Sequence, residues 1–184
     1  MKNFVFIAEF KNRVSFYQLK AKNRDVAFVM WIADFVNQPF VSKMQARGII
    51  AEFRDVDNNP CQIDGLSNVF RWAGLAWGKY LSVEYVEAMD MREEKEPYIY
   101  TFMLYLAGGT YISQHNGKSL QDAYNQWHSY FIHTPYVSAD MKEKLKEWNI
   151  NTILSSMEIS ECLCRLKLCV ADFSFELFIT KVRP

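Results

Sequence analysis

The chain has 184 residues, of which half are hydrophobic and 16% aromatic, so it can bury a large core and is not a disordered protein. Its 21 basic and 21 acidic side chains cancel, which argues against nucleic acid or an anionic membrane as a partner. The opening residues lack a signal-peptide core, and no run reaches roughly 18 apolar residues, so we expect a cytoplasmic protein without a membrane span.

A predicted hairpin and two helices open the chain. Two segments of alternating apolar residues, 4–10 and 13–21, predict antiparallel strands joined at Lys11 and Asn12. Asn23 is a typical helix N-cap, and apolar side chains then recur at the i, i+4, i+8 spacing of one helix face. A second helix is expected over 42–53.

A second predicted hairpin follows, from segments 68–77 and 80–89 with Gly78 and Lys79 at the turn. The next segment, 90–97, is rich in charge and ends in a proline, which is typical of a junction.

The residues after this junction repeat those before it. Shifting the sequence by 96 positions aligns 4–42 with 100–138 without a gap, and nine of the 39 aligned positions are identical. The identical pairs are Phe6/Phe102, Gln18/Gln114, Lys22/Lys118, Ala27/Ala123, Trp31/Trp127, Phe35/Phe131, Pro39/Pro135, Val41/Val137 and Ser42/Ser138. The closing hairpins match only after some slippage, with Cys162 and Cys164 placed against Phe70 and Trp72.

The second half therefore predicts the same elements as the first. Strands are expected at 98–106 and 110–115, helices after Ser119 and over 138–148, and a closing hairpin over 161–182. We interpret the chain as a tandem duplication of a ββααββ unit of the α+β class with antiparallel sheets. Repeat one would span 1–96 and repeat two 97–184, packed as one compact pseudo-twofold domain.

The cysteines and histidines do not form a recognisable metal or catalytic motif. Cys162, Cys164 and Cys169 follow strand alternation, which favours core packing over the C-x2-4-C pairs of zinc sites. No P-loop, serine elbow or H-E-x-x-H is present, so we expect no metal, no cofactor and no enzyme. A small enzyme that uses Cys61 or a histidine in a cleft between the repeats stays an alternative.

The first helix is apolar almost all round, unlike its counterpart. Beyond its main face it carries Val26, Phe28, Val29, Met30 and Ile32, and its counterpart has Asp122, Asn125, Gln126, His128 and Ser129 at several of these places. Such a helix is buried on more than one side or presents a partner surface. We favour a central place between the two repeats, and we keep open a structural protein that self-assembles through this face.

Acidic residues gather in two segments. The first contains Glu84, Glu87, Asp90, Glu93 and Glu94, and the second is a loop with Asp55, Asp57 and Asp64. Both could be ordinary solvated segments. They could also form an acidic surface that binds a basic protein, because charge complementarity raises association rate and specificity.

A strand with T-Y-I-S-Q followed by S-x-x-D-A-x-x-x-W at a helix start resembles modules of small bacterial toxin–immunity proteins. In this chain it comprises 109–114, Ser119, Asp122, Ala123 and Trp127, with a weaker copy over 16–31. The resemblance implies a cytosolic inhibitor that binds one toxin domain, and it assigns no site residues. We therefore expect a non-enzymatic protein-binding module, most specifically an immunity protein or antitoxin for a basic toxin domain such as a nuclease.

Overall fold

The computed structural model describes residues 1–91, 98–106, 109–135, 137–146, 155, 157–160, 162–170 and 173–183. The chain divides by its internal packing into two units, Met1–Ala88 and Met89–Pro184. Each unit contains helices and one antiparallel sheet, so the predicted α+β class is confirmed. The predicted junction at 90–97 lies mostly outside the described residues.

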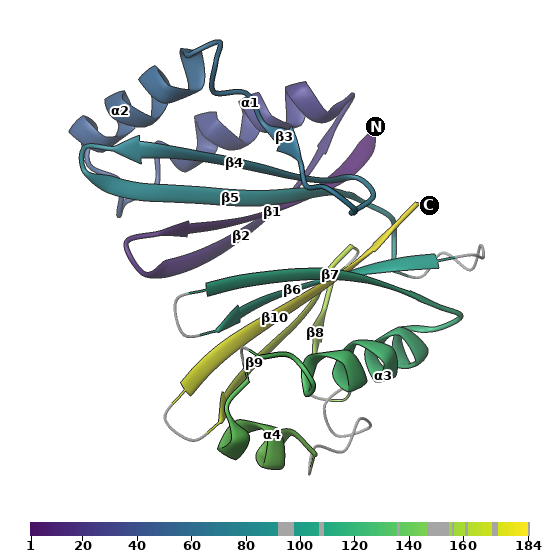
Figure 1. Cartoon of the computed structure of the whole chain (residues 1–184). Helices are drawn as coiled ribbons and strands as arrows, with labels where there is room; N and C mark the ends of the chain where they lie inside the picture. Colours follow the sequence, from purple (N-terminus) through teal and green to yellow (C-terminus); the bar gives the residue numbers. More distant parts are fainter. Residues whose placement is uncertain are drawn as a thin grey trace. The chain divides into compact units, whose positions relative to one another are not determined.

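The first unit is a five-stranded sheet with two helices on one face (Figure 1). Its strands run in the order β2-β1-β5-β4-β3, and every neighbouring pair is antiparallel. The elements are β1 (Lys2–Phe10), β2 (Arg13–Ala21), α1 (Arg24–Phe35), α2 (Lys43–Arg54), β3 (Cys61–Gln62), β4 (Val69–Ala76) and β5 (Lys79–Ala88).

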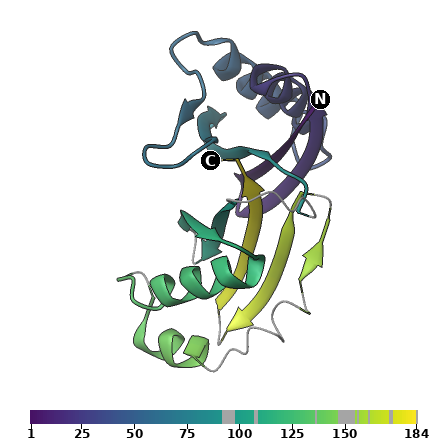
Figure 2. The same cartoon turned by 90° about the vertical axis from the view of Figure 1, so that its right-hand side faces the viewer.

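The second unit has the same architecture, with its strands in the order β7-β6-β10-β9-β8. Its elements are β6 (Tyr98–Leu106), β7 (Gly109–Gly117), α3 (Leu120–Phe131), α4 (Ala139–Lys146), β8 (Glu158–Ile159), β9 (Cys164–Val170) and β10 (Phe173–Val182). Figure 2 shows α3 and α4, in green, on the same side of this sheet. No helix in the described part of the chain is both long and apolar enough to span a membrane.

The expected helix starts are present because each has a side-chain cap. Asn23 Oδ1 accepts a hydrogen bond from Val26 N at 3.0 Å, and Ser119 Oγ accepts one from Asp122 N at 3.1 Å. Ser42 and Gln45 form a reciprocal capping box at the start of α2. The first turn of α2 is thereby fixed at Lys43, one residue after the predicted start.

Positions in the two units correspond through strand register. Helix α1 begins at Arg24 and α3 at Leu120, a difference of 96 (120 − 24), and the hairpins close at Phe10/Arg13 and Leu106/Gly109 with the same difference. The tandem duplication itself stays an interpretation of this correspondence.

The closing hairpins need a different offset from the one predicted. Phe6 pairs with Tyr85, which pairs with Phe70; Phe102 pairs with Ile179, which pairs with Cys164. Cys164 therefore corresponds to Phe70, two residues away from the sequence-based match of Cys162. The sequence match was wrong by two because both offsets keep the same strand alternation.

The core of each unit lies between its sheet and its helices. In β1 every second side chain, from Phe4 to Phe10, enters the first core, as alternation along a strand requires. Helix α1 contributes Trp31, whose ring stacks on Phe6 at 5.6 Å between centroids. The second unit repeats this contact, with Phe102 stacked on Trp127 at 5.3 Å.

Candidate functional site

The outer face of α1 carries exposed apolar side chains. The helix buries Ala27, Phe28, Trp31, Ile32 and Phe35. On its other side Val26, Val29 and Met30 are 42%, 51% and 44% exposed. These three residues are neighbours on the helix surface, at spacings of three and four residues. We call Val26, Val29 and Met30 the α1 outer face; the expectation that this helix lies between the two repeats stays a prediction.

The corresponding face of α3 is polar. Asp122, Asn125 and Gln126 occupy the positions of Val26, Val29 and Met30, and all three are exposed. The same fold thus holds its helix with polar residues at these positions. The apolar side chains of α1 are therefore not needed to hold the helix on its sheet.

Two carboxylates flank the α1 outer face. Asp25 lies one turn before Val29, and Asp34 lies one turn after Met30, so an acidic group stands at each end of the apolar surface. Arg24 Nε is 3.2 Å from Asp25 Oδ1, and its guanidinium lies over the ring of Phe70. Gln38 Nε2 donates a hydrogen bond to Asp34 Oδ2 at 3.3 Å. The surface is apolar in its centre, with the ion-paired carboxylate of Asp25 at one end and the hydrogen-bonded carboxylate of Asp34 at the other.

The predicted acidic strip is not continuous on the surface. Glu84 is 1% exposed on the sheet face opposite α1, and its Oε1 is 2.9 Å from Arg71 Nε, so it is no part of an exposed docking face. Strand alternation places Glu84 on the sheet face opposite to that of Val83 and Tyr85. Glu87 is bound to Lys2 Nζ at 2.8 Å.

The other predicted acidic residues are placed as follows. Asp90 is partly buried, whereas Glu93 and Glu94 lie outside the described residues. Asp55 ends α2, and its Oδ1 accepts a hydrogen bond from Asp57 N at 3.0 Å. Asp55, Asp57 and Asp64 are all exposed, so this loop remains accessible to a partner.

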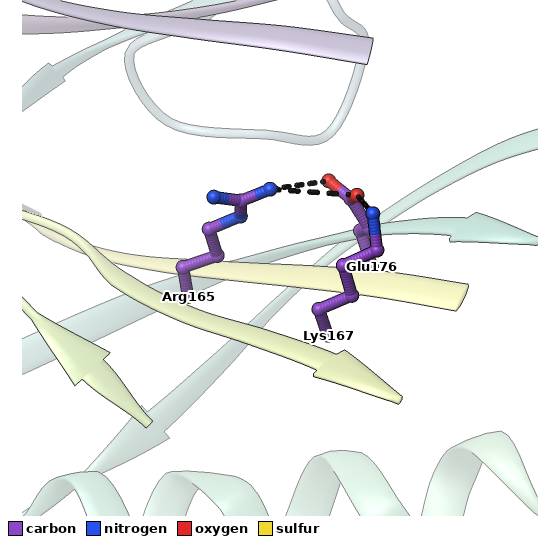
Figure 3. Close-up of polar contacts among 3 residues, drawn as sticks. All are labelled: Arg165, Lys167 and Glu176. Atoms are coloured by element: carbon purple, nitrogen blue, oxygen red, sulfur yellow. Dashed lines mark hydrogen bonds and ion pairs between the residues drawn. The ribbon is translucent and has the colours of Figure 1, made fainter. Parts of the chain in front are cut away.

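Two arginines hold buried or nearly buried carboxylates on equivalent strands. Arg71 on β4 pairs with Glu84 on β5. In the second unit Arg165 and Lys167 on β9 both point at Glu176 on β10, with Nη2 at 3.4 Å and Nζ at 2.9 Å from the carboxylate (Figure 3). Arg71 and Arg165 correspond by strand register, a relationship that the slipped sequence match concealed. We assign these ion pairs a structural role.

The cysteines are placed as core or surface residues. Cys162 and Cys164 are buried, as predicted for small core side chains, and Cys61 is exposed on β3. Burial raises the pKa of the Cys164 thiol to about 11, which keeps it protonated at neutral pH. The Cys169 side chain lies outside the description. Among the described residues no group of three or more His, Cys, Asp or Glu side chains is placed to hold a metal ion.

His115 is the histidine with a polar partner on its own strand. Its Nε2 is 3.1 Å from Ser113 Oγ, and the rings of Phe102 and Tyr130 pack against the imidazole. Burial lowers the pKa of His115, so the ring is neutral near pH 7. His128 stacks on Tyr124, and His133 is exposed. An enzyme with Cys61 or a histidine in a cleft between the repeats stays a prediction.

A second exposed apolar group, which the sequence pattern did not predict, lies at the tip of the β4–β5 hairpin. Leu75, Trp77 and Tyr80 are 58%, 63% and 62% exposed. Trp77 and Gly78 both have positive φ, of 51° and 71°, as a two-residue hairpin turn of this hand requires. A tryptophan in this conformation is strained. The sequence does hold a signal for this group: the bulky Trp77 precedes the turn glycine, a position where asparagine or aspartate is usual.

Comparison with protein-family models, with curated protein sequences and with solved structures finds no match for this chain.

Proposed function

We propose that this protein is a non-enzymatic protein-binding module whose contact surface is the α1 outer face. One observation carries the proposal: three apolar side chains are exposed on α1 where the equivalent helix α3 carries polar ones. Exposed apolar groups that the fold does not need are typical of interaction sites. Methionine also adapts well to a partner surface because its side chain is flexible.

The flanking charges define the partner's chemistry. With Asp25 and Asp34 at its ends, the α1 outer face fits a protein surface that is apolar in its centre and basic at its margins. Exposed Asp55, Asp57 and Asp64 would add to the attraction of a basic partner if the partner extends to that loop. The contact would then be favoured by burial of apolar area and oriented by charge.

In its most specific form, the proposed module is an immunity protein or antitoxin of the bacterial cytoplasm. Segment 109–127 supports this form through its resemblance to such proteins. A nuclease toxin would supply the basic margin, because an enzyme that holds phosphates carries lysine and arginine. Free thiols at Cys61, Cys162 and Cys164 agree with a reducing compartment.

A second copy of this chain is a less favourable partner for the same face. In a symmetric pair the same surface meets itself, so two copies of α1 would bring carboxylates of like sign together whichever way the helices run. Like charges across an interface oppose association. A basic partner has no such penalty.

Affinity capture tests the proposed function. The tagged full chain is incubated with a lysate of its native source, and the eluate is identified by mass spectrometry after a wash at moderate salt. We expect one stoichiometric basic protein whose enzymatic activity falls when the chain is added back. Recovery of the bait alone, from cells shown to produce the candidate partners, would contradict the proposal.

A further inference from the structure

A cavity of about 230 Å³ opens between β7 and α3 in the second unit. Ser113 lines it from the strand, and Trp127, Tyr130 and Phe131 line it from the helix. The remaining lining residues are also uncharged. For comparison, an engineered cavity of about 150 Å³ with apolar walls is large enough to bind benzene. The space therefore suits a neutral compound with one aromatic ring.

The first unit has an aromatic ring at the position that corresponds to this cavity. The residue that corresponds to Ser113 is Tyr17 (17 + 96 = 113), and its phenol ring packs edge-on against Trp31 and Phe35, at 6.5 and 6.3 Å between centroids. Trp31 and Phe35 correspond to the cavity residues Trp127 and Phe131. In the second unit a serine side chain stands where the first unit has a phenol, and the remaining space is open.

The polar atoms around the cavity suit a hydroxyl group at the far end of such a ring. In the first unit the negative charge of Asp34 acts on Tyr17: burial, and secondly this charge, raise the pKa of the phenol to about 12. Tyr130 stands at the corresponding position in the second unit, and a phenolic hydroxyl can both donate and accept a hydrogen bond. The Tyr130 hydroxyl can therefore bind a neutral ligand hydroxyl, and neither group carries a charge.

At the near end of the cavity lies Ser113, which contacts His115 beyond the lining. A serine hydroxyl can donate one hydrogen bond and accept two, so Ser113 Oγ keeps capacity beyond its 3.1 Å contact with His115 Nε2. A small polar or methyl group para to the phenol hydroxyl would lie at this end, against the Ser113 side chain, whose own Cβ takes the place of the Tyr17 Cβ.

We propose that the cavity between β7 and α3 binds a small neutral para-substituted phenol, with its ring against Trp127 and Phe131 as the Tyr17 ring lies against Trp31 and Phe35. This site is separate from the α1 outer face and does not depend on the proposed protein partner. Because the lining carries no charged side chain, a carboxylate on the ring would lose its hydration without a compensating partner.

The test is a titration of the full chain with p-cresol. Binding is measured by calorimetry and by the shift of the Trp127 indole N–H signal in NMR spectra. We expect saturable binding with a Kd on the order of 1 mM, as for a well-placed ligand of this size. The charged analogue 4-methylbenzoate should bind at least about tenfold more weakly. Absence of a saturable shift at the Trp127 signal in the wild-type protein would overturn the proposal.

Two variants locate the site. Ser113→Tyr supplies the ring of the first unit and should abolish p-cresol binding, whereas Asn116→Tyr, on an exposed position of the same strand, should leave it unchanged. Tyr17→Ser opens the equivalent place in the first unit and should add a second molecule per chain. Unchanged affinity in a folded Ser113→Tyr protein would overturn the site. Tighter binding of N-acetyltyrosinamide than of p-cresol would assign the cavity to a peptide tyrosine and overturn the free-phenol form.

Discussion

Phe6 stacks on Trp31 with its ring plane tilted by only 2°, and this contact joins an inner strand of the first sheet to α1. Tyr85 stacks on the same phenylalanine at 4.8 Å, so the ring lies in the middle of an aromatic core. The second unit reproduces the strand-to-helix contact through Phe102 and Trp127, tilted by 5°. The two contacts mark where each helix is fastened to its sheet.

Removing either phenylalanine ring should destabilise the protein. We expect Phe6→Ala and Phe102→Ala each to lower the free energy of unfolding by about 3–5 kcal/mol, because a fully buried ring leaves a cavity that the stacked tryptophan cannot fill. Urea denaturation followed by tryptophan fluorescence measures the change. Phe16→Ala, at a strand position that is 39% exposed, is the control and should cost less than about 1 kcal/mol. Equal losses in all three variants would contradict this account of the core.

The two glutamates of β5 should differ in their contribution to stability. Glu84→Gln removes the charge from a side chain that is 1% exposed and paired with Arg71, and we expect a loss of about 2–3 kcal/mol. Glu87→Gln removes an ion pair with Lys2, whose side chain is half exposed, and should cost less than about 1 kcal/mol. Thermal denaturation of both variants at one pH checks the order. A larger loss for Glu87→Gln would show that the burial of Glu84 is misplaced.

Stability should fall in alkaline solution through Cys164. Burial raises the pKa of its thiol to about 11, so the unfolded chain loses this proton at a lower pH than the folded chain. The contribution is complete below the ordinary thiol pKa and is lost as the pH rises toward 11, with a total on the order of 2 kcal/mol. We expect the melting temperature of Cys164→Ala to depend less steeply on pH in this range than that of the wild type. Cys61→Ala, at an exposed thiol, should leave the profile as in the wild type.

Replacing the strained tryptophan at the β4–β5 turn should stabilise the protein. Trp77 has a φ of 51°, which costs a bulky side chain about 1 kcal/mol and an asparagine less. Trp77→Asn is therefore expected to raise the free energy of unfolding by up to about 1 kcal/mol, measured by urea denaturation. A Cβ on Gly48 would lie only 3.0 Å from Trp77 Cδ1, so the ring rests close to α2. A net loss of stability would mean that this packing outweighs the backbone strain.

The sequence pattern predicted the elements because their signals are local. Alternating apolar residues identified the strands around Phe6 and Phe102, and Asn23 and Ser119 identified the helix starts through their capping side chains. Strand pairing in the closing hairpins was predicted two residues out of register. A slip of two keeps every side chain on its own face, so hydrophobic pattern alone cannot detect it.

The functional surfaces were less predictable because exposure is not a local property. The sequence shows that Glu84 is acidic, but only the sheet shows that this carboxylate is buried beside Arg71. It shows that α1 is apolar all round, but not which face is left exposed. The cavity lies where the second unit has Ser113 and the first unit has Tyr17. The aligned sequences contain this difference, but they do not show that it leaves an open space.

The proposed binding of a protein at the α1 outer face can be tested by substituting the three residues of that face. The triple variant Val26→Asp, Val29→Asn, Met30→Gln gives α1 the residues that α3 carries at these positions, so we expect it to fold and melt like the wild type. Both proteins are used as bait in parallel captures from the native lysate, with the eluted partner quantified against the bait. We expect the wild type to retain a stoichiometric basic partner and the folded variant to lose at least about nine-tenths of it. Equal recovery by the two baits would contradict the claim.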